Sequence, residues 1–433
     1  MCSHLSFFFF VVVKIDEIME KFPEKKSQPE LPFMFKYQEE GRIEIARTFL
    51  EEALLPSFSQ WLVGQKEKSY WRLGAVFAAG GVGKTRFAWE LIPMMLKLLK
   101  NNDDVIVRFS PMQTPWNQYQ EKDRQLLIDC LENARLIYLD VRRNGDKVEA
   151  DEFSKIKSVS SMLGARIAFK FWGLSSYDIT FPEFLKVVEK NPSKFSLPEV
   201  LNCIRHLLPH DKPSMLFVGI DEIHSVCPFP VPKATNPAET ENLGRAFHRA
   251  LVSYISQYQK SMNFFVHGCL VGTAETRKNL QLDTTDNPII PIQLLWLPRQ
   301  SVENIVRSDF ENGSELLKSN FFLRILTLAG GNARLLEGLR QTLEENPLSI
   351  NLISKWMDVS ESRFSVDVTG KWPKSIYKMA LLLAMTGIRV EMDGDVSILL
   401  IEPTTNRVIE SLMVYFNVVN FQMWKGINHT IKK

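Results

Sequence analysis

The sequence has little cysteine and no surplus of charge of one sign. Its five cysteines are odd in number and widely scattered, and no two form a Cys-x-x-Cys pair, which argues against a disulfide framework or a zinc ribbon. The 52 basic and 50 acidic residues leave a formal charge of +2. The chain therefore lacks a global electrostatic attraction for nucleic acid or anionic lipid. We expect a reducing compartment, and any such binding to be local.

Long apolar runs are also missing. The run at residues 5–13 (LSFFFFVVV) has nine residues and is too short to cross a bilayer. No Lys or Arg precedes it and no small-residue cleavage site follows it, as a signal peptide would require. We favour a buried strand or an incorrect gene start over a signal. The sequence thus predicts an intracellular chain, in cytoplasm or nucleus, with no membrane partner.

Short apolar runs alternate with amphipathic stretches over the first 300 residues. Strands are expected at 71–78, 105–109, 136–141, 215–220 and 264–271. Helices are expected at 42–54, where Pro56 should stop the run, and at 86–99, 121–133, 160–171, 197–208 and 242–259. Residues 228–240, with four prolines, should form a loop. This alternation predicts an α/β fold with a mostly parallel sheet between helices.

A glycine-rich loop separates the first expected strand from its helix. Residues 78–85 are AAGGVGKT, the phosphate-binding loop pattern with Ala78 at its first position. Glycines let successive N–H groups turn toward one anion, and the helix that follows presents its positive end. Lys84 should reach the β and γ phosphates, and Thr85 should offer its hydroxyl to Mg²⁺. The alternative is a turn that only caps the helix. The nucleotide-binding residues expected for ATP or another NTP are Ala79, Gly80, Gly81, Val82, Gly83, Lys84, Thr85 and Arg86.

Two acids close the expected strand MLFVGIDEIH, residues 215–224. In an open α/β sheet, ligands bind at the carboxyl ends of the strands. We expect Asp221 to hold Mg²⁺, directly or through water, and Glu222 to polarise the attacking water. Strands often end in acids for other reasons, so this pattern gains its weight from the phosphate loop upstream. Together they predict hydrolysis as well as binding.

Further polar residues follow the later strand and the helical part. Thr273 is expected to orient the lytic water or sense the γ-phosphate, with a helix cap as the alternative. Arg334, after two glycines, could place a cation over the nucleotide, or could lie on a solvated helix face. Arg245 and Arg249 could serve a neighbouring copy in trans, although a solvated face is favoured. Self-association therefore stays open.

In this order along the chain, the motifs resemble those of P-loop ATPases of the AAA+ and signal-transduction type. The segments ARLIYLDVRRNGD, SSMLGARIAFKFW, GTAET and GGNARLLEGL look like the NTPase module shared by crinkler-type effectors and retrotransposon-hot-spot proteins. This likeness covers roughly residues 70–420. It implies a winged-helix-like segment after the lid and then a nuclease domain. No paired-carboxylate plus lysine signature follows the lid here, so we expect the NTPase part without its nuclease.

The motifs divide the chain and predict its activity. We expect an N-terminal segment and linker at 1–40, a P-loop NTPase core at 41–300, a helical lid at 301–356, and a small winged-helix-like unit at 357–433. The predicted activity is Mg²⁺-dependent hydrolysis of an NTP, by expectation ATP, with γ-phosphate sensing coupled to lid movement. The alternative is a nucleotide-gated switch with little hydrolysis. Nucleic-acid binding, secretion or action in a host cell would follow from the crinkler likeness and not from charge.

Overall fold

The structure of the chain is a computed structural model. It describes residues 15–20, 41–65, 71–78, 81–101, 105–109, 112–142, 147–208, 212–232, 239–256, 263–273, 288–346, 348, 352, 355 and 356. The N-terminal apolar run, the predicted linker and the predicted winged-helix-like unit lie outside them. Two compact units are present, one with Arg42–Ala78 and Lys84–Leu294, and the other with Ala79–Gly83 and the chain from Leu295.

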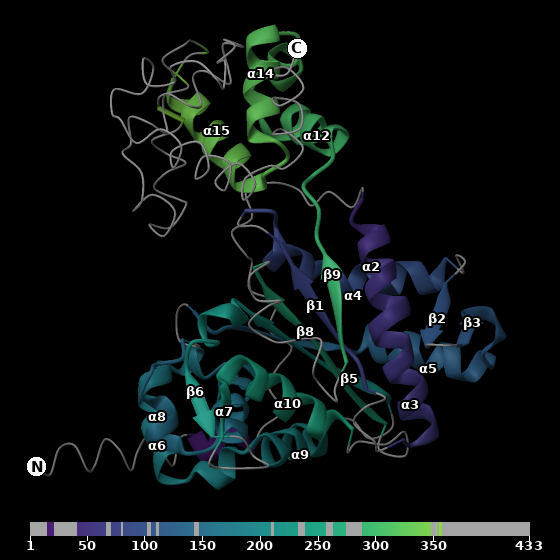
Figure 1. Cartoon of the computed structure of the whole chain (residues 1–433), viewed down its shortest axis with the longest axis vertical. Helices are drawn as coiled ribbons and strands as arrows, with labels where there is room; N and C mark the ends of the chain where they lie inside the picture. The colour runs from purple at the N-terminus through teal and green to yellow at the C-terminus, as the bar shows by residue number, and fades with distance from the viewer. Residues whose placement is uncertain are drawn as a thin grey trace, which may run out of the picture. The chain divides into compact units, whose positions relative to one another are not determined.

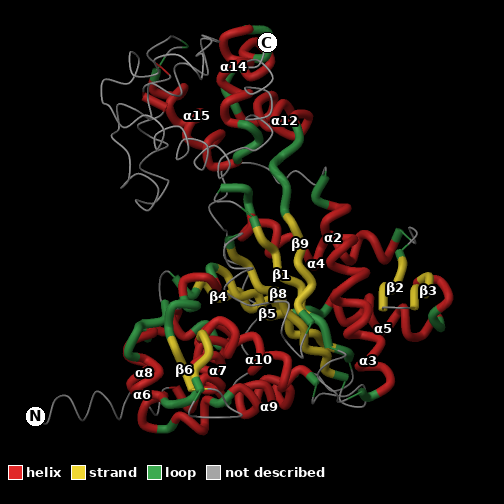
Figure 2. Tube along the Cα trace, viewed as in Figure 1, coloured by secondary structure: helices red, strands yellow, loops and turns green. Residues whose placement is uncertain are grey.

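A five-stranded sheet forms the centre of the first unit (Figure 2). Its order is β4-β5-β8-β1-β9, and every neighbouring pair is parallel. The strands are β1 (Leu73–Phe77), β4 (Arg135–Asp140), β5 (Ser214–Asp221), β8 (Phe264–Gly272) and β9 (Ile289–Gln293). β5 and β8 are buried along their whole length, as their continuous apolar runs require. The mostly parallel sheet expected from the sequence is confirmed.

Helices cover both faces of this sheet (Figure 1). One face carries α2 (Ile43–Phe49), α3 (Leu55–Val63), α4 (Lys84–Lys100) and α5 (Glu121–Glu132). The other carries α7 (Val159–Phe171), α9 (Leu197–Leu207) and α10 (Leu243–Ile255). The shorter elements of this unit are η3 (Trp116–Gln118), α6 (Glu152–Ile156), η5 (Leu174–Tyr177), α8 (Phe181–Lys190), η6 (Pro192–Phe195) and η7 (Ile223–Ser225).

The first helical run continues where a stop was predicted. A π-helical turn, η1 (Leu50–Leu54), joins α2 to α3, and Pro56 is the second residue of α3. The predicted stop was wrong because the chain passes through this π-helical turn, and Pro56 lies in the first turn of the helix after it, where the hydrogen-bonding pattern changes. Phe49 of this run packs so closely on the sheet that a Cβ at Gly74 would lie 2.1 Å from its ring.

Two expectations about the sheet and its loops need correction. Residues 106–109 form a strand, β2 (Ile106–Phe109), but it pairs antiparallel with β3 (Met112–Pro115) outside the central sheet. The buried carboxylate of Glu51 holds this ribbon by accepting from the N–H of Ile106 at 3.0 Å and Nε of Arg108 at 2.8 Å. The proline-rich segment also contains a short antiparallel pair, β6 (Pro230–Pro232) with β7 (Thr240–Asn242).

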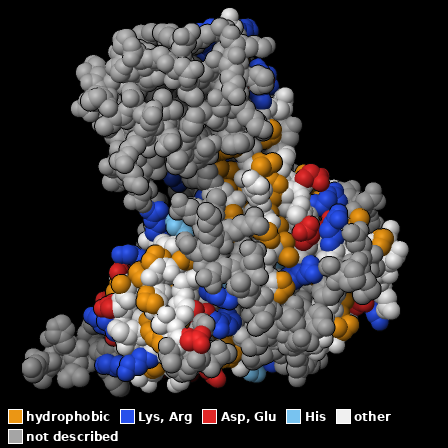
Figure 3. Space-filling view, in the orientation of Figure 1, with side chains coloured by type: hydrophobic (Ala, Val, Ile, Leu, Met, Phe, Trp, Pro, Cys, Tyr) orange, Lys and Arg blue, Asp and Glu red, His pale blue; other side chains and the backbone are white. Residues whose placement is uncertain are grey.

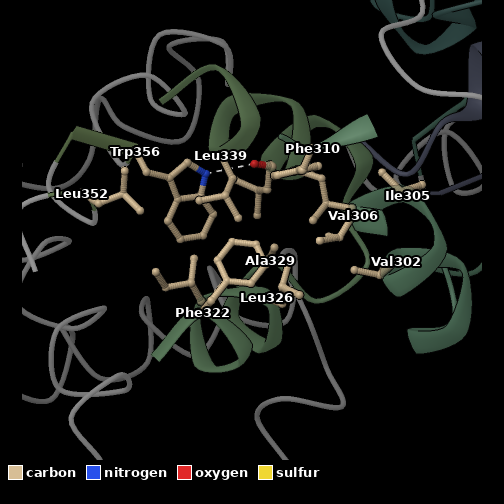
Figure 4. Packing of buried hydrophobic residues seen from close by; sticks show 13 residues of the cluster. Val302, Ile305, Val306, Phe310, Phe322, Leu326, Ala329, Leu339, Leu352 and Trp356 are labelled. Atoms are coloured by element: carbon tan, nitrogen blue, oxygen red, sulfur yellow. Dashed lines mark hydrogen bonds between the residues drawn. The ribbon is translucent and has the colours of Figure 1, made fainter. Parts of the chain in front are cut away.

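The second unit has a hydrophobic core of its own (Figure 4). Its helices are α12 (Arg299–Asp309), α13 (Gly313–Leu316), α14 (Asn320–Ala329) and α15 (Ala333–Glu345). Phe322, Leu336 and Trp356 pack at its centre, and Nε1 of Trp356 donates to the carbonyl of Leu335 at 2.9 Å. The helices expected in the predicted lid are present. Among the helices that the structure describes, none is long and apolar enough to cross a membrane.

A buried ion pair fastens the helices that follow β4. Arg166 of α7 is fully buried and donates from both terminal nitrogens to the Glu152 carboxylate at 2.6 Å. It also donates to the carbonyls of Met162 at 3.0 Å and Lys147 at 2.9 Å. All of these contacts depend on one guanidinium, so loss of the carboxylate leaves a buried charge without its counterion.

We predict that Glu152→Ala lowers the free energy of unfolding by about 3–5 kcal/mol, the usual cost of breaking a buried pair from one side. Urea denaturation followed by circular dichroism measures this change. The matched control is Lys155→Ala, which removes an exposed ion pair with Asp151 one turn away and should leave the free energy nearly unchanged. Equal stability of the two variants would contradict a stabilising role for the buried pair.

Two buried histidines make the fold sensitive to acid. Burial lowers the pKa of His248 in α10 to about 3 and that of His267 in β8 to about 4, from an ordinary value of 6.5. Unfolded chains thus bind protons below pH 6.5 that the folded protein does not. We predict that stability is fully present above pH 6.5 and falls toward pH 4 by about 1.4 kcal/mol per pH unit for each histidine.

Urea denaturation at a series of pH values measures this slope. In His267→Gln one of the two histidines is gone. The slope of unfolding free energy against pH between pH 6 and 4.5 should therefore fall from about two protons to about one. An unchanged slope in this variant would show that the acid sensitivity comes from other groups.

Candidate functional site

The ends of three neighbouring strands meet at the carboxyl edge of the sheet. β1 leads into the glycine-rich loop, β5 ends at Asp221, and β8 ends at Gly272. The N–H of Ala78, at the loop entrance, donates to the carbonyl of Gly272 at 3.2 Å. Because all three strands are parallel, the loop entrance, Asp221 and Thr273 lie along one edge, where open α/β sheets bind ligands.

The glycine-rich loop has the backbone that its sequence predicts. Gly81 has φ +79° and Gly83 has φ +92°, conformations that side chains disfavour. Lys84 is buried at the start of α4, and its Nζ donates to the carbonyl of Ala78 at 3.1 Å. The ammonium group therefore folds back toward the end of β1. Val82 is buried and Arg86 is half-buried on the first turn of α4, whereas Ala79 and Gly80 lie outside the described residues.

Asp221 is the centre of a hydrogen-bonded cluster. The Thr85 hydroxyl donates to its Oδ2 at 2.6 Å, across 136 positions of sequence. The Tyr138 hydroxyl donates to the same oxygen, and the N–H of Glu222 donates to Oδ1 at 2.7 Å. Burial raises the pKa of Asp221, while the bonds from Thr85 and Tyr138 oppose that rise. These three donors compensate the buried carboxylate for its lost water.

Tyr138 was not predicted as a site residue. Burial, and then the nearby Asp221 carboxylate, raise its pKa well above the ordinary value, so the hydroxyl keeps its proton and acts as the donor. It reaches Asp221 because Tyr138 pairs with Gly219 in the β4–β5 register, two residues before Asp221 on the same face. A tyrosine in a strand of that kind gives no sequence signal of its own.

Glu222 lies beside Asp221 in a strained backbone. Its φ is +56°, in the left-handed region that non-glycine residues rarely adopt. Its Oε2 lies 3.2 Å from Nε2 of His224 and 3.6 Å from Nη1 of Arg142, which follows β4. Burial lowers the pKa of His224, although Glu222 opposes that shift. Arg142 and His224 are further site residues that were not predicted, and they hold the carboxylate of Glu222.

The structure gives the positions of the remaining predicted residues, and their roles stay predictions. Thr273 follows β8 and is half-buried. Arg334 lies in the first turn of α15, where the Asn332 side chain accepts from its N–H at 3.0 Å. Arg249 forms an ion pair with Glu241 of its own chain, and the N–H of Arg245 donates to Asn242 at 2.8 Å. The roles of Thr273 and Arg334 at a nucleotide stay predictions.

The oxygen donors at this edge suit a hard divalent cation. The Thr85 hydroxyl and the Asp221 carboxylate are ligands of the kind that Mg²⁺ prefers. No group of three or more His, Cys, Asp or Glu in the described part of the chain could hold a metal by itself. Mg²⁺ typically takes one or two protein ligands and completes its shell with phosphates and water, so these residues fit it.

No family model matches the chain, and no curated protein matches it significantly. The Walker-type ATPase PABY2304 of Pyrococcus abyssi is 12% identical, over 93% of this chain and 92% of its own, with a TM-score of 0.41. The Aeropyrum pernix ORC2 protein, in ADPNP-ADP complexes, is 12% identical over 95% and 97%, with a TM-score of 0.40. The Aeropyrum pernix ORC1 protein, in complex with DNA, is 12% identical over 90% and 86%, with a TM-score of 0.36. All three TM-scores lie below 0.5, so no residue role is taken from these proteins.

Asn332 packs against the glycine-rich loop, and both lie in the second unit. A Cβ at Gly81 would lie 2.3 Å from Oδ1 of Asn332, which is buried and caps α15. We predict that Gly81→Ala destabilises the protein by more than the about 1–2 kcal/mol of a left-handed alanine. Thermal unfolding measures the change.

Gly83→Ala is the matched control, because Gly83 also has a positive φ but a Cβ there would meet no atom within 4 Å. It isolates backbone strain from the Asn332 contact. Equal destabilisation of the two variants would contradict the importance of that contact.

Proposed function

We propose that the chain is a Mg²⁺-dependent NTP hydrolase, an ATPase of the P-loop AAA+ type. The observation that carries this proposal is the 2.6 Å hydrogen bond between Thr85 and Asp221. It joins the start of the helix after the glycine-rich loop to the acidic end of β5. A loop that only capped α4 would have no need of an acid brought to it from a separate strand.

The phosphates would bind to the glycine-rich loop. α4 begins at Lys84, directly after the loop, and the positive end of a helix favours an anion. Lys84 would exchange the carbonyl of Ala78 for the β and γ phosphates. In this exchange the buried ammonium group of Lys84 would give up a neutral carbonyl acceptor for a charged phosphate oxygen.

Thr85 and Asp221 would hold Mg²⁺ together with the phosphates. When bound, Mg²⁺ supplies positive charge that offsets the charge developing on the transferred phosphoryl group. The Thr85 hydroxyl donates its proton to Asp221, so its lone pairs stay available to a cation. Asp221 would keep its negative charge through the same hydrogen bonds that orient it.

Glu222 would act as the general base that accepts a proton from the attacking water. Its neighbours Arg142 and His224 hold Oε2 at 3.6 and 3.2 Å, so the carboxylate must leave them, wholly or in part, to reach that water. This pairing is also the observation that favours the second candidate, a nucleotide-gated switch with little hydrolysis. In a switch, Glu222 would stay beside Arg142 and His224 while nucleotide binds.

Thr273 and Arg334 would sense the γ-phosphate and couple it to movement of the lid. Support for this part comes from their positions after β8 and at the start of α15.

The narrower proposal of a crinkler-like effector depends on the loose sequence motifs alone. On the face drawn in Figure 3, basic and acidic side chains of the described residues are interspersed, so the charge on that face does not support a nucleic-acid partner.

We predict that Glu222→Gln reduces turnover at least about 100-fold, the usual contribution of a general base, while ATP binding persists. Lys84→Ala should weaken binding itself by at least about tenfold, through loss of a charge-assisted hydrogen bond. Phosphate release under steady-state conditions and titration with a fluorescent ATP analogue measure the two effects. Glu199→Gln, on the exposed first turn of α9, is the matched control and should behave as the wild type.

The same assay separates the two candidate functions. Equal turnover in the wild type and Glu222→Gln would contradict the role of Glu222 as the base, and ATP binding without turnover in the wild type would replace the hydrolase by the switch. ATP binding by Lys84→Ala that is as tight as in the wild type would contradict the assignment of the loop. A parallel series with duplex DNA at several salt concentrations tests the nucleic-acid partner, for which stimulation is the required result.

A further inference from the structure

Tyr138 lies at the junction of three elements of the sheet unit. Its ring covers Gly219 of β5, where an added Cβ would lie 3.0 Å from Cδ2 of the tyrosine. On the other side it meets the indole of Trp89, with ring centroids 5.3 Å apart and planes inclined by 38°. Trp89 lies one helical turn after Thr85 in α4, on the same side of the helix. The ring is therefore held between β5 and the helix that carries Thr85.

The hydroxyl of this fixed ring reaches the acid of the site. It donates to Oδ2 of Asp221, the oxygen that also accepts from Thr85 at 2.6 Å. Oδ1 accepts from the N–H of Glu222 at 2.7 Å. A carboxylate accepts about four hydrogen bonds, and protein donors occupy three of these positions. One position is left for a ligand or its water.

From this arrangement we propose that Tyr138 is a positioning residue for the metal–nucleotide complex. It fixes the rotation of the Asp221 carboxylate, and through it the direction in which the Thr85 hydroxyl presents its lone pairs. The inference depends on the proposed Mg²⁺–NTP function and adds to it a residue outside the loop and the acidic strand end.

The physical reason is that the last torsion of aspartate is soft. Rotation of a carboxylate about its Cβ–Cγ bond has broad, shallow minima. The two donors on Oδ2 come from different elements, Thr85 from α4 and Tyr138 from β4, so they oppose that rotation from two directions. Loss of Tyr138's hydroxyl would leave Thr85 as the sole side-chain donor to Asp221 among the described residues.

The tilted ring contact with Trp89 ties the position of Tyr138 to one arrangement of α4. Trp89 and Thr85 move together with α4, and Tyr138 belongs to β4. A displacement of α4 would therefore disturb both contacts to the Asp221 cluster at once. Tyr138 thus links the cation ligands to the position of the helix behind the loop.

Tyr138→Phe tests this inference because it removes only the hydroxyl. The ring, its packing on Gly219 and its tilted contact with Trp89 are kept. We expect the Mg²⁺ concentration that half-saturates ATP binding to rise by about tenfold, as for loss of one hydrogen bond to a charged acceptor. Binding of ATP without Mg²⁺, in excess EDTA, should stay as in the wild type. Titration of MgCl₂ into protein with a fluorescent ATP analogue gives both values without any turnover.

Two comparisons show whether the hydroxyl acts through Asp221. Tyr119→Phe is the matched control, since it removes another tyrosine hydroxyl, bound to Ser59 at 2.8 Å away from the site, and should leave the Mg²⁺ midpoint unchanged. In an Asp221→Asn background, Tyr138→Phe should add less than about twofold to the midpoint, since the residue it positions has lost its charge.

Each outcome decides the inference. A shifted midpoint with intact Mg²⁺-free binding, which disappears in the Asp221→Asn background, supports it. A wild-type midpoint in Tyr138→Phe overturns it and leaves the proposed NTP function standing. No ATP binding by the wild type, with or without Mg²⁺, overturns the proposed function and this inference with it. Equal losses with and without Mg²⁺ assign Tyr138 to general packing and also overturn it.

Discussion

The hydrogen bond between Thr85 and Asp221 is the contact on which the site depends. It exists only if β1 and β5 run parallel with one strand, β8, between them, and if α4 returns along the face that holds Gly219. Burial of β5 and β8 along their full length sets that order, because a strand hidden on both faces must lie inside the sheet. Hydrophobic packing therefore brings together two polar groups that are far apart in sequence.

The central part of the fold could be predicted because its signals are local. Continuous apolar runs predict β5 and β8, and glycines between a strand and a helix predict the loop. β9 escaped prediction because Pro291 interrupts its pattern, which an outer strand tolerates. Residues 106–109 were recognised as a strand but assigned to the wrong sheet, since they pair with β3 and are held by the buried Glu51, a tertiary contact without sequence signature.

The candidate site divides in the same way. Lys84, Thr85, Asp221 and Glu222 belong to motifs in which residue type and spacing carry the chemistry. Tyr138, Arg142 and His224 lie in the quoted segments at positions to which no role was assigned, and they enter the site through the β4–β5 register and the turn after β5. An alternation of apolar and polar residues predicts that a strand exists, but not which strand lies beside it. Residues supplied by a neighbouring strand are for this reason the ones that sequence patterns miss.

The charged groups described at this edge are already engaged by the protein itself. Lys84 donates to Ala78, Asp221 accepts three hydrogen bonds, and Glu222 lies beside Arg142 and His224. A nucleotide must therefore replace existing partners, and each exchange contributes only the difference between two interactions. The net gain is largest where a neutral acceptor gives way to a charged one, as at Lys84. Under the proposed function the exchange at Glu222 runs the other way, because the cationic Arg142 would be given up for a neutral water. Under the proposed function, the edge of the sheet that binds the nucleotide also restrains Glu222, so release of Glu222 is the step at which a second signal would act on turnover.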